Sequence, residues 1–274
     1  MRVFITGASS GIGEALARHY AANGAQYDTL GILGILGTPD TPVTPATLGL
    51  AARRQRRLFD LVAELPGVHA PYPLDVADAP ALEAAAGDFI ARFGCPDIVI
   101  ANAGISVGTL TGEAEDLPAF RRVLETNVLG MVHTFAPFIQ AMQARGSGTL
   151  VGIASVAGIR GLPGAGAYSA SKAAVIAYLE ALRVELRSSG IKVVTLTPGY
   201  IATPMTAKNP YPMPFLLPAD VAARRFARTI ARGTRYAVIP WQMGLVAKLL
   251  RLLPNPLFDV LFARAGRKPR GLDL

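Results

Sequence analysis

Three glycines near the start of the chain constrain its fold more than any other feature of the sequence. The β-rich run Arg2-Val-Phe-Ile-Thr6 leads directly into Gly7-Ala-Ser-Ser-Gly11-Ile-Gly13, and a helical pattern then covers residues 14–23. A glycine turn between a strand and a helix lets the backbone approach a pyrophosphate, which the first-turn amides and the helix dipole attract. The spacing is G-x-x-x-G-x-G rather than G-x-G-x-x-G, and a tight turn without a ligand is the competing interpretation. We expect a dinucleotide site here.

Strand-like and helix-like patterns alternate along the rest of the chain. Residues 97–101 are almost wholly apolar, as a parallel strand covered on both faces should be. The alternation predicts a single α/β domain with one doubly wound, Rossmann-like parallel sheet at residues 1–240, followed by a C-terminal helical extension at 241–274. The expected strands are residues 2–6, 47–52, 69–74, 97–101, 148–153, 192–197 and 236–239, and the expected helices are 14–23, 80–93, 118–144, 165–186 and 218–232.

Residues 26–46 interrupt this alternation. They contain several glycines and then Thr-Pro pairs at 38–39, 41–42 and 44–45, a period of three that is typical of polyproline II and incompatible with a central strand. We interpret them as an insertion between the first helix and the second strand, away from the ligand crevice at the carboxyl ends of the strands. The competing interpretation takes residues 30–36 as the second strand.

Composition excludes several classes of protein. A single cysteine, Cys95, leaves no internal disulfide and no cysteine metal cluster, and the three histidines lack ligand spacing, so we expect no metal. No apolar run reaches the ~20 residues that span a bilayer, and no leader precedes the first strand, which predicts a cytoplasmic location. The net charge is +8, but the basic residues are scattered without a nucleic-acid motif. We expect solvated helix faces, one phosphate contact and a lipid surface rather than nucleic acid.

Basic residues follow the expected second strand. Ala52 ends that strand, and Arg53 and Arg54 come next. An acidic residue here would bind the ribose 2′-hydroxyl of NAD, whereas a small residue followed by arginine favours the 2′-phosphate of NADP. The alternative is that residues 53–57 only solvate the next helix. We expect Arg53 to bind the 2′-phosphate and NADP to be preferred over NAD.

A tyrosine and a lysine share one face of the helix expected at 165–186. Tyr168 and Lys172 are four residues apart, so their side chains point the same way. A nearby ammonium favours phenolate and draws the pKa of a tyrosine down from about 10 towards the working pH of a general acid/base. On its own, such a pair is weak evidence, because most tyrosines and lysines at this spacing only form a solvated helix face.

Other polar residues lie where a site is expected. Asn102, Ser155 and Thr203 each follow the end of an expected strand, and the carboxyl edge of an open α/β sheet is where ligands bind. Asn127 lies in the middle of the apolar helix at 118–144, where its side chain needs a hydrogen-bond partner.

With the three glycines, Asn102-Ala-Gly104, Asn127, Ser155 and Tyr168-x-x-x-Lys172 in this order, the chain resembles the short-chain dehydrogenase/reductase family of NAD(P)-dependent oxidoreductases. The resemblance covers about residues 1–25 and 47–240. It implies that Tyr168 protonates the substrate oxygen during carbonyl reduction and that Ser155 hydrogen-bonds the same oxygen. Lys172 would lower the pKa of Tyr168 and hold the nicotinamide ribose, while Asn127 would help to hold a proton-relay water.

The resemblance also implies cofactor contacts and an assembly. The pyrophosphate loop would be lined by Gly7, Ser10, Gly11, Ile12 and Gly13, the adenine flanked by Asp75 and Val76, the ribose side lined by Asn102, Ala103 and Gly104, and the carboxamide bound by Ile201 and Thr203. Family members commonly pair through the two long helices, here 118–144 and 165–186, which implies a homodimer or homotetramer.

The last third of the chain bears on the substrate. The family's mobile substrate loop corresponds to residues 204–218, whose apolar side chains indicate an apolar substrate or ordinary core packing. The basic, Trp-led helical segments at 241–253 and 257–264 could lie in a membrane interface, cap the substrate pocket or form a subunit contact. We therefore expect an oxidoreductase acting on an apolar ketone, aldehyde or alcohol. The alternatives are a non-catalytic NADP(H)-binding regulatory protein and a membrane-associated reductase of lipid-like substrates.

Overall fold

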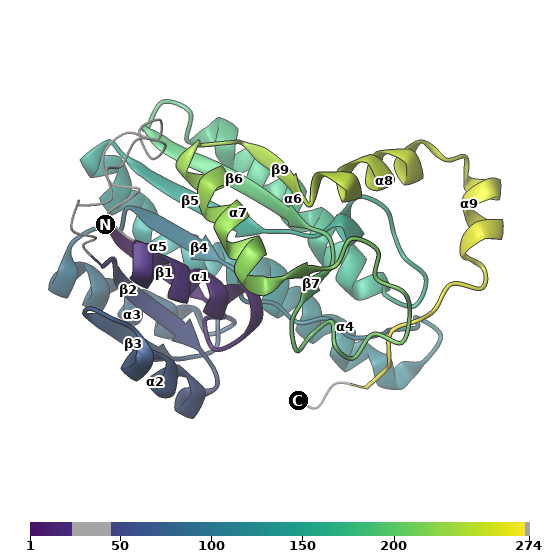
Figure 1. Cartoon of the computed structure of the whole chain (residues 1–274), viewed down its shortest axis with the longest axis horizontal. Helices are drawn as coiled ribbons and strands as arrows, with labels where there is room; N and C mark the ends of the chain where they lie inside the picture. The colour runs from purple at the N-terminus through teal and green to yellow at the C-terminus, as the bar shows by residue number, and fades with distance from the viewer. Residues whose placement is uncertain (24–44, 272–274) are drawn as a thin grey trace.

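The chain forms one parallel sheet with helices on both faces. The computed structural model describes residues 1–23 and 45–271 (Figure 1). In the described part, the central sheet has seven strands in the order β3-β2-β1-β4-β5-β6-β9. These strands are β1 (Arg2–Thr6), β2 (Thr47–Ala52), β3 (His69–Pro73), β4 (Ile98–Ala101), β5 (Gly148–Ile153), β6 (Ile191–Pro198) and β9 (Tyr236–Ile239). The strand order reverses between β1 and β4, and a crevice forms at the carboxyl ends of strands at such a switch point.

Two helical layers cover the sheet. The helices are α1 (Gly11–Asn23), α2 (Gln55–Glu64), α3 (Ala79–Phe93), α4 (Leu117–Leu124), α5 (Gly130–Arg145), α6 (Gly166–Glu185), α7 (Ala219–Ala231), α8 (Trp241–Leu252) and α9 (Asn255–Phe262). Side chains alternate between the faces of each strand. Val3 and Ile5 of β1 therefore join the core under α1, α2 and α7, and Phe4 joins the core under α3, α5 and α6. Both faces are buried at β4, which is why that strand is apolar throughout.

The expected second strand is confirmed. Thr47–Ala52 pairs in parallel with β1, with Arg2 opposite Thr47 and Thr6 opposite Ala51. The competing strand at residues 30–36, and nearly all of the expected insertion at 26–46, lie outside the described residues. The expected fold class, a doubly wound parallel sheet with further helices at the C-terminal end, is also confirmed.

The long helix expected at residues 118–144 is present, but it is not one regular α-helix. The structure has α4, then a π-helical turn, η4 (Glu125–Leu129), and then α5. A π turn inserts one residue into the helical ladder, and such turns are frequent at functional sites. A two-stranded pairing between β7 (Ile201–Ala202) and β8 (Leu217–Pro218) was also not expected. No helix in the ranges that the structure describes is both long and apolar enough to cross a membrane.

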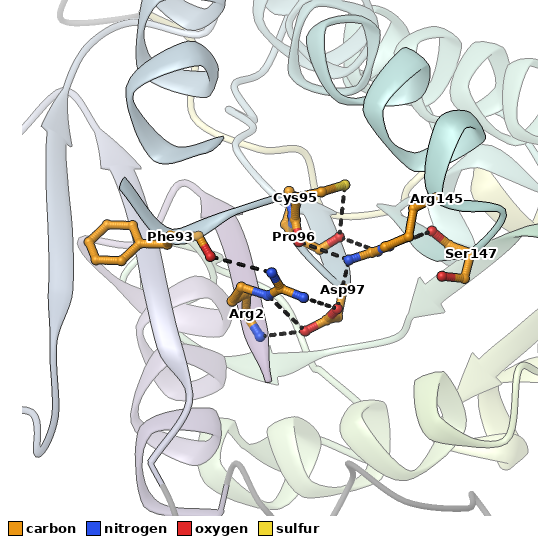
Figure 2. Close-up of polar contacts among 7 residues, drawn as sticks. All are labelled: Arg2, Phe93, Cys95, Pro96, Asp97, Arg145 and Ser147. Atoms are coloured by element: carbon orange, nitrogen blue, oxygen red, sulfur yellow. Dashed lines mark hydrogen bonds and ion pairs between the residues drawn. The ribbon is translucent and has the colours of Figure 1, made fainter. Parts of the chain in front are cut away.

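A carboxylate ties together the amino edge of the sheet, opposite the crevice. Asp97, just before β4, accepts hydrogen bonds from the Arg2 backbone amide at 2.7 Å and from the Arg2 guanidinium at 3.2 Å. On its other side it accepts from Arg145, the last residue of α5, at 2.9 Å. Figure 2 shows the two guanidinium groups converging on this one carboxylate. The contact fixes the start of β1 and the end of α5 against β4.

Candidate active site

The glycine loop is packed against the end of β4. Gly7 has a φ of +68°, and a Cβ there would lie 2.8 Å from Ala103 Cα; a Cβ on Gly13 would overlap the Gly7 carbonyl oxygen. Asn102 Nδ2 donates to the Thr6 oxygen at 3.0 Å and to the Gly7 oxygen at 3.3 Å. Both glycines are therefore required by close backbone approach, and the turn holds the start of α1 open towards the crevice.

A cleft of about 570 Å³ runs along the carboxyl ends of the strands. It brings together most of the residues expected from the sequence: Gly7, Ser10, Gly11, Ile12, Arg53, Asp75, Val76, Asn102, Ala103, Gly104, Ser155, Tyr168, Lys172, Ile201 and Thr203. Gly13 and Asn127 lie behind this lining. Arg54, which follows Arg53, and Met205 and Lys208 of the 204–218 segment also line the cleft, and the sequence analysis did not indicate Ile105 and Thr126.

Ser155, Tyr168 and Lys172 form one cluster in the cleft. The Ser155 hydroxyl lies close enough to the Tyr168 phenol to favour its ionised form. Lys172 lies one helical turn further along α6, with its ammonium 5.8 Å from the centre of the Tyr168 ring and donating to the Ile153 carbonyl at 2.8 Å. The expected shared helix face is thus present, and the end of β5 supplies both Ser155 and the carbonyl that positions Lys172.

Burial is the largest influence on the pKa values of Lys172 and Tyr168. It lowers the pKa of Lys172 to about 8. Burial also raises the pKa of Tyr168, and the nearby Ser155 hydroxyl opposes that rise. The sequence led us to expect a net lowering of the Tyr168 pKa; in the protein alone the net shift is upward, because desolvation of the phenolate is the larger effect.

The π turn aims Asn127 at the backbone behind the cleft. Its Oδ1 accepts from the Ile105 amide at 2.8 Å, and its Nδ2 donates to the Ile105 carbonyl at 3.0 Å and to the Ser171 hydroxyl at 2.9 Å. A Cβ on Gly104 would lie 3.2 Å from Asn127 Oδ1 and 3.6 Å from Lys172 Nζ. Asn127 thus has the partner that its burial demanded, and it lies close to the lysine.

The two arginines after β2 have different partners. Arg54 donates to Ser9 Oγ at 3.0 Å and also to Ser10 Oγ, which places its guanidinium on the glycine loop. Arg53 lies 3.8 Å from the Asp75 carboxylate, which Arg122 also contacts. Burial and the neighbouring arginines lower the pKa of Arg54. Of the two arginines, Arg54 is therefore the one held against the glycine loop, although the sequence analysis singled out Arg53.

These residues fit a dinucleotide. Gly11 is a second loop glycine that could not carry a side chain freely, since its φ is +59° and a Cβ would lie 3.2 Å from Thr203 Cγ2. Thr126 Oγ1 is buried on the wall of the cleft and has no hydrogen-bond partner among the described residues, so a ligand hydroxyl or phosphate could satisfy it. The helix N-terminus and the two arginines add the positive potential that phosphates require.

The substrate side of the cleft is bounded by the segment from β7 to β8. Met205 lines the cleft, while Phe215 and Leu216 are exposed. The chain then continues through α7 and β9 to α8 and α9, which project from the end of the sheet (Figure 1). Both C-terminal helices agree with the expected segments to within a few residues.

Comparison with known proteins supports the fold and identifies the family. The sequence profile described as short chain dehydrogenase matches residues 44–212. An uncharacterized oxidoreductase from Myxococcus xanthus is 36% identical over 258 residues, covering 93% of each chain. The structure of a 3-ketoacyl-ACP reductase from Sinorhizobium meliloti 1021 superposes with a TM-score of 0.72 at 26% identity, covering 90% of this chain and 100% of the other. An alcohol dehydrogenase from Thermococcus sibiricus, complexed with 5-hydroxy-NADP, gives 0.68 at 25% identity, covering 87% and 95%.

The profile covers more than half of the chain, and the relative from Myxococcus covers nearly all of it. With the parallel sheet and the glycine cradle described above, these matches show that the protein belongs to the short-chain dehydrogenase/reductase family of NAD(P)-dependent oxidoreductases.

Proposed function

We propose that the protein is an NADP-dependent oxidoreductase that interconverts a ketone or aldehyde and an alcohol, with Tyr168 as acid/base. The observation that carries this proposal is the grouping of Tyr168 with Ser155 and Lys172 in the same cleft as the glycine loop. Pure nucleotide binding does not require that cluster. NADPH would supply the hydride, which is the cofactor's own chemistry.

The chain's residues have distinct tasks in this mechanism. Ser155 holds the substrate oxygen and stabilises the negative charge that develops on it during reduction. Tyr168 gives its proton to that oxygen in reduction and takes it back in alcohol oxidation. Lys172, when protonated, would stabilise the Tyr168 phenolate that forms as the proton leaves. Asn127, close to Lys172, would hold a relay water that returns the proton.

The remaining cleft residues would hold the cofactor. Ser10 and the loop glycines bind the pyrophosphate, Asp75 and Val76 flank the adenine, Asn102 to Gly104 line the ribose side, and Ile201 and Thr203 bind the carboxamide. The preference for NADP over NAD rests on the adjacent guanidinium groups of Arg53 and Arg54 at the end of β2.

Turnover with both cofactors tests the proposal. The full chain is assayed with NADPH and NADH over a panel of apolar ketones, aldehydes and secondary alcohols, and NADPH binding is followed by fluorescence. We expect turnover with NADPH, and a loss of about 10²- to 10⁴-fold in Tyr168→Phe with cofactor binding retained. Full activity in Tyr168→Phe would refute the assigned mechanism, and tight NADPH binding without turnover would favour the regulatory alternative.

Assembly and location extend the proposal. We propose a homodimer or homotetramer that pairs through α6 and the helical run from α4 through η4 to α5. Leu129 of η4 and Val184 of α6 expose 50% and 60% of their surface. Light scattering of the wild type and of Val184→Glu tests this: a lower mass in the variant supports pairing through α6. The division into a catalytic domain at 1–240 and an extension at 241–274, and a cytoplasmic location, also stay proposals.

A second proposal concerns α8 and α9. Trp241, Leu245, Leu249 and Leu252 follow one another at four- and three-residue spacing on α8 and are all more than half exposed. Lys248 and Arg251 lie on the same helix. An exposed apolar stripe beside basic residues suits the interface of an anionic membrane.

Vesicle cosedimentation tests the membrane proposal. The full chain and Leu249→Glu are sedimented with vesicles of phosphatidylglycerol and phosphatidylcholine, with Val68→Glu, an equally exposed position far from α8 in sequence, as the control. We expect binding to be lost only in Leu249→Glu. Equal binding of both variants would remove α8 from the proposal.

A further inference from the structure

We propose that Lys268 binds an anionic group of the substrate, so that the preferred substrates are oxo acids and hydroxy acids rather than neutral ketones and alcohols. This inference rests on the proposed function, because it adds a substrate class to the same site. It is carried by residues 264–271, here called the C-terminal strap, which the sequence analysis did not connect with the catalytic cluster.

The strap returns from α9 to the body of the protein and is anchored there. Gly108 N donates to the Pro269 carbonyl at 2.8 Å, and Gly108 and Arg270 form a parallel bridge. The Arg270 guanidinium lies 2.8 Å from Asp116, 3.3 Å from Glu115 and 3.4 Å from Glu113. Figure 1 shows the yellow end of the chain running back from α9 to the loops beside α4.

The surface under the strap is shaped to receive it. A Cβ on Gly108 would overlap the Lys268 carbonyl oxygen, and one on Gly164 would lie 3.0 Å from Arg267 Cγ. These two glycines belong to neighbouring loops, since Thr109 N donates to the Gly164 carbonyl at 2.9 Å. Gly164 lies just before α6 and Tyr168. The strap therefore packs against the two loops that lie next to Tyr168.

This course places Lys268 beside Tyr168. Its Nζ lies 5.5 Å from the centre of the Tyr168 ring and donates to Ser106 Oγ at 2.6 Å. Within the ranges that the structure describes, Lys268 forms no ion pair, although Arg270, two residues later, contacts three carboxylates. An ammonium has three N–H donors, and here the protein accepts one of them.

A half-buried ammonium without a counter-ion is unfavourable unless a ligand supplies one. Burial lowers the pKa of Lys268 to about 8, and no carboxylate in residues 1–23 and 45–271 counteracts it. Such a cation beside a catalytic group is a mark of a binding site. A carboxylate of the substrate would complete the hydrogen bonding of Lys268 while the substrate oxygen contacts Tyr168 and Ser155, and Ile105 and Met205 would pack against the apolar remainder.

Two other roles for Lys268 make different predictions. A second ammonium that only stabilised the Tyr168 phenolate would accelerate every substrate alike. An ammonium that only anchored the strap to Ser106 would position the loop near Tyr168, and its loss would affect acids and esters equally. Only binding of an anionic group discriminates an oxo acid from its ester.

The experiment uses three matched pairs: phenylglyoxylate, benzoylacetate and benzoylpropionate, each against its methyl ester, with NADPH and the full chain. We expect Lys268→Gln to raise KM for the preferred acid at least about tenfold, with little change in kcat and no change for the ester. Lys268→Arg should retain most of the preference for the acid. Lys248→Gln, which removes the same charge from exposed α8, is the control and should change neither substrate.

Equal KM values for acids and esters, or an equal loss for both in Lys268→Gln, would overturn the inference while leaving the proposed function intact. Calorimetric titration of phenylglyoxylate into the protein with NADP⁺, which cannot reduce it, gives a readout without turnover. Weaker binding in Lys268→Gln supports the inference, and unchanged binding refutes it. If no carbonyl compound is reduced, the proposed function fails, and the titration still decides the role of Lys268.

Discussion

The guanidinium of Arg54 donates two hydrogen bonds to the hydroxyl of Ser9, at 3.0 Å and 3.2 Å, and so joins the end of β2 to the glycine loop of the neighbouring strand. A cation in this position has a fixed orientation before any ligand arrives. Side chains that are held in place by neighbouring hydrogen bonds lose little entropy on binding. The same contact makes Arg54, rather than Arg53 alone, the residue to vary.

Arg54→Ala should raise KM for NADPH at least about tenfold, since a charge-assisted hydrogen bond to phosphate is lost. KM for NADH should change little, because NADH has no 2′-phosphate. Arg53→Ala, at a residue that faces Asp75, should have the smaller effect. Steady-state kinetics with both cofactors measure the change, and an equal loss with NADPH and NADH would show that Arg54 supports the loop rather than the phosphate.

Ser155→Ala should lower kcat by about 10²- to 10³-fold, as expected for the loss of one donor to a developing oxyanion. KM for NADPH should stay the same, because the cofactor contacts are elsewhere in the cleft. Ser155 also accepts a hydrogen bond from Ala157 N at 3.2 Å, so thermal unfolding of the variant serves as the control for damage to the loop. A variant with unchanged kcat would exclude Ser155 from the chemistry.

Asn127→Ala should destabilise the protein by about 1–3 kcal/mol, because the partly buried amide and carbonyl of Ile105 lose their partner. Urea denaturation measures this loss. Asn127→Asp keeps the acceptor for Ile105 N but not the donors to Ile105 O and Ser171, so it should not restore stability. Wild-type stability in Asn127→Ala would show that water replaces the amide and that the π turn does not depend on it.

The stability of the protein should depend on pH through Lys172. Burial lowers its folded-state pKa from 10.5 to about 8, so below about pH 8 the unfavourable burial of the charge is fully present. Between about pH 8 and 10.5 the unfolded chain binds more protons at this site, and the free energy of unfolding therefore rises with pH. Above that range both states are neutral.

We expect wild type to gain stability relative to Lys172→Met across this window, by at most about 3 kcal/mol. Urea denaturation of both proteins at matched pH values measures the difference, and Lys248→Met controls for the loss of an exposed lysine. Parallel pH profiles of wild type and Lys172→Met would contradict the assigned burial effect.

Asp97→Ala should cost about 2 kcal/mol of stability without changing KM, because Arg2 and Arg145 lose a shared acceptor at the edge opposite the cleft. Asp220→Ala, which removes an exposed carboxylate paired with Arg224 one helical turn away, is the control and should cost less than about 0.5 kcal/mol. Chemical denaturation compares the two variants. A similar small cost for both would show that the cluster in Figure 2 is solvated rather than structural.

Most elements of the fold could be predicted from local patterns. A run of apolar residues predicted β4, and the glycine turn predicted the junction of β1 and α1. The long helix through Asn127 was predicted as continuous, because a π turn changes the hydrogen-bonding period at a single position and leaves little trace in the hydrophobic pattern.

Some features of the candidate site could be predicted from the sequence and others could not. Spacing alone predicted that Tyr168 and Lys172 share a helix face, and Ser155 could be predicted as a residue that follows a strand. Which of Arg53 and Arg54 contacts the glycine loop could not be predicted, because it depends on which side chain reaches Ser9 on another loop. The net direction of the Tyr168 pKa shift could not either, since it depends on how completely neighbouring elements exclude water.

The sequence by itself determined the order of strands and helices, the glycine cradle and the spacing of the catalytic pair, because these follow from backbone periodicity and steric limits within a few residues. Only the tertiary structure decided that residues 264–271 come back to Tyr168 and bring Lys268 with them. That return depends on contacts between residues about 150 positions apart, such as Arg270 with Asp116, and no local pattern records such a contact.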